Sequence, residues 1–510
     1  MPMPPSIKRR RSAAFAGLAA GATALSLLQT PATAATRPAK PPTDTRLGRI
    51  DMDKATIPQL ERLMRSGQLS SVAVTTFYLN RIRRVDPLLH AVLQVNPDAL
   101  AEARLSDRAR RTRGSARLLE GIPVLLKDNV GTHDREHTTA GSLALLGARP
   151  ADAALVTKLR NAGAVIIGKT TTTEFGWKSP GDCPLHGITR NPWNPAYSTG
   201  GSSSGAGAAA AAGFGPLHLG TDAGGSIRIP AAWCGVVGLK PSFGRVPQWP
   251  LSAFGSVSCA GPLARTVRDA ALMLSALARH DSRDPYCLPD DPRDWCRGIE
   301  DGVAGLRVSV LRRPGFDAPV DADGIAAVEQ AAAILADAGA EIEDEDPGLP
   351  DTSLIFGQLW AASLAALAGS MPADRRALLD PGILEVAAAH AGLTGLALMQ
   401  GEALRVEAAH RMAAFHRRFD LVLCPTVPGP PPLADAPTED AFAALFRDWA
   451  PWTALFNLTR QPAISVPLGL GAAGLPRSVQ LAARLYRDDL VLRAARVLEQ
   501  AVPAGMAHLG

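Results

Sequence analysis

The sequence predicts an α/β protein built as one large domain. Short apolar runs typical of buried strands, such as 123–126, 165–167 and 306–311, alternate with longer stretches that have apolar residues at helical spacing. The length alone would suggest roughly three domains. No internal repeat or long low-complexity linker divides the chain, and alanine, leucine and valine are plentiful enough to build a sizeable core. We therefore expect a single folding unit.

The N-terminus is typical of an export signal. Lys8–Arg11 form a positive region, residues 13–28 are apolar and rich in small side chains, and Ala32–Ala34 fit a cleavage site. The apolar run is short, so we expect a cleaved signal peptide over 1–34 and no stable membrane insertion afterwards. Residues 35–48 are rich in Pro and Thr and predict a flexible linker. The protein is then periplasmic or secreted, and the paired arginines allow a twin-arginine route; the alternative is a disordered basic N-terminus.

The charge of the chain gives no support for a polyanionic partner. The formal net charge is +5, but the segment 1–34 holds four basic residues and no acidic one, so the remainder carries +1. A charge this close to zero does not favour nucleic acid or an anionic membrane as a partner.

The six cysteines are too few for a fold built on disulfides. Cys234, Cys259 and Cys424 have apolar neighbours and are predicted to be buried thiols. In an exported protein Cys287 and Cys296 are close enough in sequence to pair, and such a bridge would contribute roughly 2–3 kcal/mol.

The first elements are predicted by periodicity. Residues 57–64 have apolar side chains at helical spacing, and a second helix is expected over 72–85. The apolar residues 123–126 predict a buried strand that carries Lys127 into the interior. An amphipathic helix over 152–161 and a strand over 165–167 follow.

The second half of the chain predicts further α/β structure. A strand, a helix and the start of another strand indicate a βαβ unit, and an alanine-rich helical region and two buried strands follow it. These segments are, in order, 306–311, 324–338, 340–342, 351–412, 420–428 and 462–469.

The stretch 200–230 contains the candidate site. Two Gly/Ser clusters flank an alanine-rich run that predicts a short buried helix. Glycine allows backbone conformations that aim several N–H donors at one point, which is how an oxyanion is held. Ser202 and Ser226 lie in these clusters, and a serine nucleophile needs a neighbouring base.

Lys127 is the candidate base, because no histidine stands in a recognisable triad context. A lysine accepts a proton only when neutral, so its pKa must fall about 3 units from roughly 10.4, at a cost on the order of 4 kcal/mol. Burial alone can lower the pKa of a lysine by about 3–5 units.

These segments together resemble the amidase signature family of serine hydrolases. The resemblance rests on GIPVLLKDN at 121–129, GGSSSG at 200–205, GTDAGGSIRIPAAWCGVVGLKPSFGRV at 220–246 and GPLARTVRDAA at 261–271. The spacing agrees as well, since Ser226 lies 24 residues after Ser202, as in the family. The resemblance implies a mixed central β-sheet surrounded by many α-helices, in a single amidase domain over 49–505.

The resemblance also implies a mechanism. It makes Ser226 the nucleophile, Ser202 a relaying serine with a cis peptide bond, and Lys127 the base. It implies an oxyanion hole from the backbone N–H groups of Ala223, Gly224, Gly225 and Ser226. The expected reaction is hydrolysis of a small-molecule carboxylic amide to an acid and ammonia or an amine through an acyl-enzyme, with no cofactor and no metal.

Charged residues near the site have two interpretations. Arg228 either meets a substrate carboxylate or pairs with Asp222 and braces the loop, and we favour bracing because most paired charges inside folds are structural. Glu174 stands where the family has a recurrent glutamate, which implies a loop-positioning role. The chain departs from the family pattern at Thr171, Arg460, Ser478 and Ala483, which bears on subfamily and substrate.

Three other motifs compete with this interpretation. His133, Asp134 and His137 invite a metal site, but Gly131 and the threonines favour a loop. Residues 163–170 fit the phosphate-loop pattern, yet a helix precedes the first glycine and β-branched residues stand inside. Ser203 fits a nucleophile elbow, which must follow a strand directly, whereas prolines precede this one.

Three other functions share the same residues. The transamidation subunit of a tRNA-dependent amidotransferase would need partner subunits and a cytoplasmic location. An esterase or acyl transferase would use the same three side chains, and a silent binding protein would keep only the fold. The oligomeric state stays open, and a homodimer is one of the states allowed.

Overall fold

The computed structural model describes residues 46–48, 50–113, 117–133, 138–147, 150–436, 440–503, 505 and 507. These residues belong to one compact unit. The predicted signal peptide and nearly all of the predicted linker lie outside the described residues.

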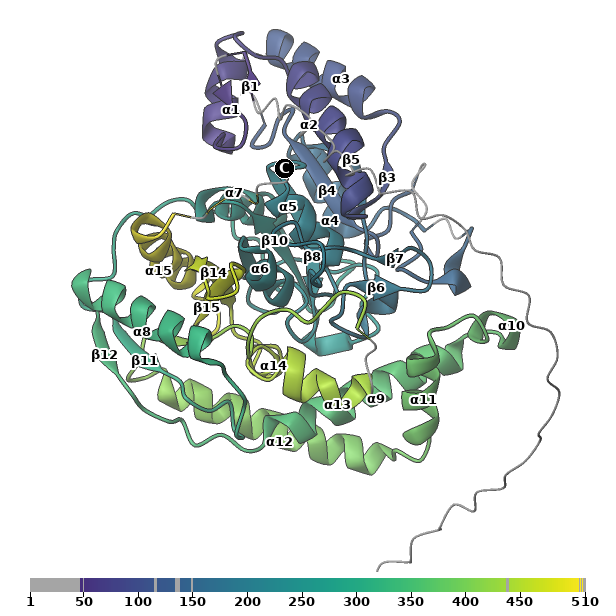
Figure 1. Ribbon diagram of the computed structural model, residues 1–510, viewed down its shortest axis with the longest axis vertical. Coiled ribbons are helices and arrows are strands. Elements are labelled where there is room, and N and C mark those ends of the chain that lie inside the picture. Colours follow the sequence, from purple (N-terminus) through teal and green to yellow (C-terminus); the bar gives the residue numbers. More distant parts are fainter. Residues whose placement is uncertain are drawn as a thin grey trace, which may run out of the picture. The chain divides into compact units, whose positions relative to one another are not determined.

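A mixed β-sheet of eleven strands forms the centre of the described unit (Figure 1). Its order is β12-β11-β13-β15-β14-β9-β10-β8-β4-β5-β3. The strands β8, β4 and β5 are parallel to one another, as are β12, β11 and β13, and the strands between these groups pair antiparallel. The strands are β3 (Val92–Val95), β4 (Pro123–Lys127), β5 (Val165–Thr170), β8 (Leu217–Asp222), β9 (Val237–Lys240), β10 (Cys259–Ala264), β11 (Arg307–Val310), β12 (Glu341–Glu343), β13 (Leu421–Pro425), β14 (Ala463–Leu470) and β15 (Pro476–Ala483).

Two short strand pairs lie outside this sheet. One joins β1 (Arg46–Leu47) to β2 (Ile50–Asp51), and the other joins β6 (Asp182–Cys183) to β7 (Gly187–Ile188).

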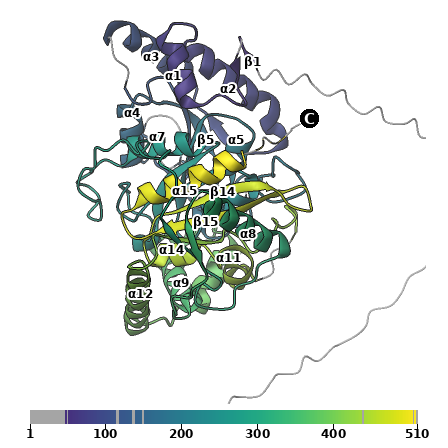
Figure 2. The same ribbon diagram turned by 90° about the vertical axis from the view of Figure 1, so that its left-hand side faces the viewer.

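Helices pack around the central sheet. α7, α8 and α15 contact one another and pack on the sheet, and Figure 2 looks onto α15 and α8 beside β14 and β15. α5 and α6 pack together against the central strands, and α9, α11 and α12 form a helical layer of their own. The helices are α1 (Ile57–Arg65), α2 (Ser71–Val85), α3 (Ala99–Arg113), α4 (Ala154–Asn161), α5 (Ser204–Ala211), α6 (Arg228–Cys234), α7 (Val267–Leu277), α8 (Ala322–Asp337), α9 (Thr352–Ser370), α10 (Ala373–Arg376), α11 (Pro381–Ala389), α12 (Gly395–Phe415), α13 (Ala441–Ala444), α14 (Ala454–Leu458) and α15 (Asp488–Ala501).

Small side chains allow α5 and α6 to pack closely behind the site. Every residue of α5 is buried. A Cβ on Gly207 of α5 would lie 2.9 Å from the Cβ of Pro230 in α6, which is too close for a normal contact. α6 ends at Gly235, whose left-handed backbone conformation is the one that glycine adopts without a steric penalty. The alanine-rich run thus forms the buried helix that its composition predicts.

Most elements expected from the sequence are present. The second predicted helix is α2, Lys127 ends the strand β4, and β11, α8 and β12 form the parallel βαβ unit. The helical region after residue 351 contains α9 to α12, and the two late strands are β13 and β14. The mixed sheet surrounded by helices confirms the fold class.

The structure rejects the phosphate loop and the nucleophile elbow. Residues 165–170 form the buried strand β5, which follows a turn after α4, so no loop is present to cradle a phosphate. Ser203 stands at the N-terminus of α5, and no strand directly precedes it. Its hydroxyl donates a hydrogen bond to the carbonyl of Thr221 at 3.2 Å, which engages it in the loop.

All six cysteines are free thiols, so the predicted pairing of Cys287 with Cys296 is wrong. Their thiols make separate contacts: Cys287 Sγ donates to the carbonyl of Leu288 at 3.5 Å, and Cys296 Sγ donates to that of Arg268 at 3.7 Å. Closeness in sequence did not bring the two side chains together. Cys234, Cys259 and Cys424 are buried, as expected.

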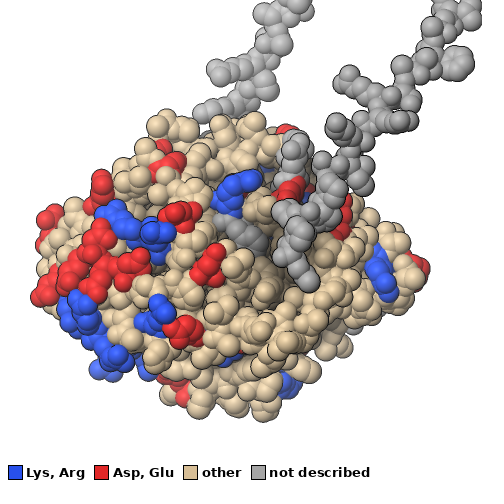
Figure 3. All heavy atoms as spheres, turned by 90° about the horizontal axis from the view of Figure 1, so that it is seen from below, with Lys and Arg blue, Asp and Glu red and all other residues tan. Residues whose placement is uncertain are grey.

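The surface carries charges of both signs. Figure 3 shows acidic and basic side chains interspersed on the face seen from below. Among helices, α9 is long and apolar enough to cross a membrane by length and composition, with a mean hydropathy of 1.3. Its side chains Phe356, Trp360 and Leu364 are nevertheless buried in an apolar cluster.

Candidate active site

Lys127 lies at the end of β4 in the middle of the sheet and is fully buried. Its Nζ donates hydrogen bonds to Ser202 Oγ at 2.7 Å and to Thr221 Oγ1 at 3.0 Å. Asn129 Nδ2 donates to the same threonine hydroxyl at 2.9 Å. Thr221 belongs to the neighbouring strand β8, so two adjacent strands orient the amine toward Ser202.

Burial lowers the pKa of Lys127 from 10.5 to about 7, and the negative charge of Asp222 opposes this shift. The low-dielectric interior disfavours the ammonium form, which explains the direction. About half of the amine is then neutral at pH 7. A neutral amine has a lone pair and can accept the proton of the Ser202 hydroxyl.

Ser202 follows a cis peptide bond from Gly201, the backbone feature that the family resemblance implies. Its side chain is buried. A Cβ on Gly176 would lie only 2.8 Å from Ser202 Oγ, and Gly176 has a φ of +80°, so glycine is needed there for two reasons. The segment around Gly176 therefore packs directly on Ser202.

Ser226 stands at the turn before α6 and is 8 % exposed. Its carbonyl accepts a hydrogen bond from the N–H of Ser203 at 3.2 Å, which places the two Gly/Ser clusters side by side. Within the described part of the chain the Ser226 hydroxyl has no hydrogen-bond partner. The structure thus brings the segments of Lys127, Ser202 and Ser226 together at the ends of β4 and β8.

The loop from Asp222 to Ile227 presents fewer oxyanion donors than the sequence predicts. The Gly225 N–H donates to Asp222 Oδ1 at 2.8 Å, so this group is already engaged. The N–H groups of Ala223, Gly224 and Ser226 have no acceptor among the described residues. The prediction is corrected to these three groups.

Arg228 braces this loop. Its Nε and one terminal nitrogen donate to the two carboxylate oxygens of Asp222 at 3.0 and 2.9 Å, and both side chains are fully buried. Its other terminal nitrogen donates to Gln480 Oε1 at 2.5 Å. Although burial opposes it, the positive charge of Arg228 lowers the pKa of Asp222 to about 2. With its donors engaged inside the protein, Arg228 is not placed to meet a substrate carboxylate.

Glu174 links the Ser202 side of the site to the helical layer. One carboxylate oxygen accepts from Ser142 Oγ at 2.5 Å, and the other accepts from the N–H of Asp380 at 2.5 Å, just before α11. Burial raises the pKa of Glu174 to about 7. Its position two residues before Gly176 agrees with the loop-positioning role that the resemblance implies.

The proposed metal ligands are only partly described. Asp134 and His137 lie outside the described residues, and among those that are described no group of three His, Cys, Asp or Glu side chains could hold a metal ion. Lys169 is structural: its Nζ is buried and donates to Thr138 Oγ1 at 2.8 Å.

Arg460 explains one departure from the family pattern. Its backbone has a φ of +63°, a conformation that glycine adopts easily. Here arginine occupies it, and the guanidinium lies 4.5 Å from the centre of the Phe243 ring, a cation–π contact that offsets part of the backbone cost.

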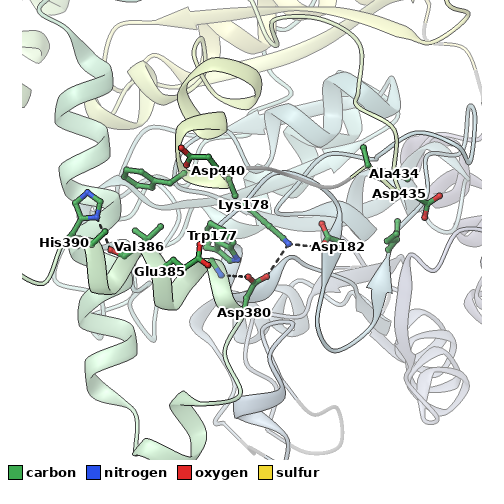
Figure 4. A pocket seen from close by; sticks show the side chains of 16 residues that line it. Trp177, Lys178, Asp182, Asp380, Glu385, Val386, His390, Ala434, Asp435 and Asp440 are labelled. Atoms are coloured by element: carbon green, nitrogen blue, oxygen red, sulfur yellow. Dashed lines mark hydrogen bonds and ion pairs between the residues drawn. The ribbon is translucent and has the colours of Figure 1, made fainter. Parts of the chain in front are cut away.

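A cavity of about 480 Å³ lies beside the segment that packs on Ser202 (Figure 4). Trp177 and Lys178 form one wall, and α11 and Phe442 contribute to the others. Lys178 Nζ lies between the carboxylates of Asp182 and Asp380, at 2.7 and 3.3 Å. Ser226 is not among the lining residues, so Trp177 and Lys178 stand between the cavity and the reactive serines.

Comparison with known proteins agrees with this geometry. The family model described as "Amidase" matches residues 73–492. Two relatives are each named as one of the subunits of glutamyl-tRNA(Gln) amidotransferase: that of Synechococcus sp. (strain CC9311) is 33% identical, with 87% of this chain and 96% of the relative covered, and that of Geobacter metallireducens is 34% identical, with 89% and 98% covered.

Solved structures give the same result. A bacterial aryl acylamidase of the amidase signature family superposes with a TM-score of 0.80 at 29% identity, covering 88% of this chain and 96% of that one. A peptide amidase from Stenotrophomonas maltophilia superposes with a TM-score of 0.76 at 31% identity, covering 89% and 98%.

The fold and the serine and lysine side chains define a large α/β enzyme of the serine hydrolase type. The chain belongs to the amidase family, whose members are the amidase signature enzymes.

Proposed function

We propose that this protein hydrolyses small linear carboxylic amides through an acyl-enzyme on Ser226. The observation that carries the proposal is the 2.7 Å contact between Lys127 Nζ and Ser202 Oγ, together with the burial that lowers the pKa of Lys127 to about 7. A serine hydroxyl next to a half-neutral amine is a proton relay, and a relay is what a serine nucleophile needs.

The reaction begins when Ser226 Oγ attacks the amide carbonyl carbon. The proton of Ser226 passes to Ser202 while Ser202 passes its own proton to Lys127. The carbonyl oxygen becomes an oxyanion held by the N–H groups of Ala223, Gly224 and Ser226, and each such donor is worth about 3–4 kcal/mol of barrier.

The C–N bond then breaks. The proton on Lys127 returns through Ser202 to the leaving nitrogen, which departs as ammonia or an amine. Water next attacks the ester of Ser226, giving its proton to the same relay. The carboxylic acid leaves, and Ser226 regains its proton.

A fluorophosphonate tests the assignment, because it phosphonylates an activated serine. The protein and its Ser226→Ala, Ser203→Ala and Lys127→Ala variants are treated with the probe, followed by intact mass and peptide mapping. We expect one adduct on Ser226, kept in Ser203→Ala, lost in Ser226→Ala and much slowed in Lys127→Ala. Ser203 is the matched control because it lies in the same buried loop; an adduct there, or none on any serine, overturns the proposal.

A substrate panel follows. Primary amides, anilides and peptide amides are compared by release of ammonia or amine, and each is paired with the ester of the same acid. Amide turnover supports an amidase, whereas turnover of esters alone supports the esterase alternative.

The second candidate is one component of a multi-subunit amidotransferase, which the names of the relatives favour. Such a protein works with partner subunits, so it would release little ammonia from simple amides alone. Purification of the tagged full chain from its own cells discriminates: a stoichiometric complex with partner subunits favours this candidate, and an active chain without them favours the hydrolase.

We also propose export, on the basic residues Lys8–Arg11, the apolar stretch 13–28 and the small residues Ala32–Ala34. N-terminal sequencing of the protein recovered from its own cells should find a mature chain starting at Ala35 outside the cytoplasm. A chain that keeps residues 1–34 inside the cytoplasm contradicts export and strengthens the amidotransferase candidate.

A further inference from the structure

The peptide groups of the oxyanion loop are held through their carbonyl oxygens. The carbonyl of Asp222 accepts a hydrogen bond from Asn457 Nδ2 at 3.0 Å, that of Gly224 from Thr453 Oγ1 at 2.5 Å, and that of Gly225 from the Ile229 N–H at 2.7 Å. A trans peptide unit is planar, with its N–H directed opposite to its C=O. Each contact on a carbonyl therefore sets the direction of the N–H that follows it.

The contact made by Asn457 sets the direction of the Ala223 N–H. Asp222 C=O and Ala223 N–H belong to one peptide plane, and Asn457 Nδ2 holds the carbonyl side of that plane. The N–H side has no acceptor among the described residues. It is thus available to an oxyanion formed at Ser226.

Asn457 is itself fixed on all sides. It lies on α14, more than 200 residues along the chain from the loop, and is 1 % exposed. Its Nδ2 also lies 2.9 Å from Asp222 Oδ1 and 3.0 Å from the carbonyl of Val257, and its Oδ1 accepts from Arg228 at 2.6 Å. An amide held by four contacts has no freedom to rotate away from the peptide that it supports.

Thr453 supports the next part of the loop from just before the same helix. Its hydroxyl bonds the Gly224 carbonyl, while the N–H of the same peptide donates to Asp222 Oδ1. A Cβ on Gly225 would lie 2.2 Å from Thr453 Oγ1, so the two segments pack as closely as glycine permits. Both ends of this peptide are therefore fixed.

We propose that Asn457 is a positioning residue for the oxyanion hole, holding the Ala223 N–H toward the carbonyl oxygen that Ser226 attacks, with Thr453 doing the same for the adjoining peptide. The inference rests on the proposed function, since it assigns a role within that reaction. The alternative is that Asn457 only satisfies buried carbonyls and stabilises the fold.

Removing a complete oxyanion donor lowers kcat by about 10²–10³-fold. In Asn457→Ala the donor remains but loses its orientation, so we expect a smaller fall in kcat, of about tenfold or more. KM should change less, because the hydrogen bond to the oxygen strengthens as negative charge develops. The pH midpoint of the rate should stay where Lys127 sets it.

The test compares Asn457→Ala with Asn96→Ala. Asn96 is also a buried asparagine, and its Nδ2 donates to the carbonyl of Ile166 at 2.7 Å, far along the sheet from the loop. Three quantities are measured: the rate constant for phosphonylation of Ser226, kcat and KM on an amide, and affinity for a trifluoromethyl ketone, which forms an oxyanion on the serine. Urea unfolding gives the stability of each variant.

Loss of kcat, phosphonylation rate and ketone affinity in Asn457→Ala, with nearly normal values in Asn96→Ala, supports the proposal. Equal kinetics in the two folded variants overturns it. Should Asn457→Ala fail to fold, Thr453→Val and Thr453→Ser decide: the proposal requires slow phosphonylation in the former and recovery in the latter. A native protein that does not react at Ser226 refutes the proposed function instead.

Discussion

The neutral form of Lys127 should set the pH dependence of catalysis. Its pKa of about 7 predicts that the rate of Ser226 phosphonylation, and kcat/KM on amides, rise about tenfold per pH unit below pH 7 and level off above it. With an ordinary pKa of 10.5, only about 0.03% of the amine would be neutral at pH 7, against about half here. Burial is thus worth about a thousandfold in available base.

The same burial makes Lys127 costly for stability. The difference between 10.5 and about 7 corresponds to about 5 kcal/mol. The unfolded chain binds the proton more tightly than the folded protein, so the free energy of unfolding rises with pH between about 7 and 10.5. The penalty is complete below pH 7 and is lost as the pH approaches 10.5.

Lys127→Met tests both effects, because methionine has a similar length and no charge. We expect the variant to lose most phosphonylation. We also expect its stability advantage over the native protein in urea unfolding to shrink by about 2–3 kcal/mol between pH 6 and pH 9. The reasoning is refuted if the native rate is constant from pH 5.5 to 8.5, or if the stability difference does not change with pH.

Three other predictions follow from buried groups. Arg228→Met leaves the Asp222 carboxylate buried without its partner and should lower the free energy of unfolding by about 3–5 kcal/mol in urea unfolding; a change under 1 kcal/mol would contradict the bracing role. Glu174→Gln should stabilise the protein more at pH 8 than at pH 5, because the raised pKa of Glu174 penalises its ionised form as the pH rises from 4.5 through about 7; equal melting temperature changes would speak against this. Thiol titration in denaturant without reductant should find six thiols, and four would indicate that Cys287 and Cys296 pair.

Parts of the fold could be predicted because their sequence pattern is local. The strand before Lys127 is a continuous apolar run, and the βαβ unit from 307 to 343 has a long amphipathic helix between two strands. The central strands β8 and β10 were missed. Their sequences LHLGTD and CAGPLA contain Gly, His and Pro, which have low strand propensity, and they are held by pairing with each other.

The site was predictable in its reactive residues but not in its supports. The motifs around Lys127, Ser202 and Ser226 identify the chemistry by spacing alone. Nothing local indicates that Asn457 reaches Asp222 or that the Gly225 N–H turns toward the Asp222 carboxylate, since these contacts depend on the packing of α14 against β8 and the loop after it.

Asp222 belongs to both halves of the reaction at once. Its charge opposes the fall in the pKa of Lys127, and its carboxylate oxygens bind the loop that carries Ser226. A substitution there would therefore change proton transfer and oxyanion binding together, and double-mutant cycles between the two halves should show coupling through this residue. Adjusting the base without disturbing the oxyanion loop would then have to proceed through Thr221 or Asn129, which contact the lysine side alone.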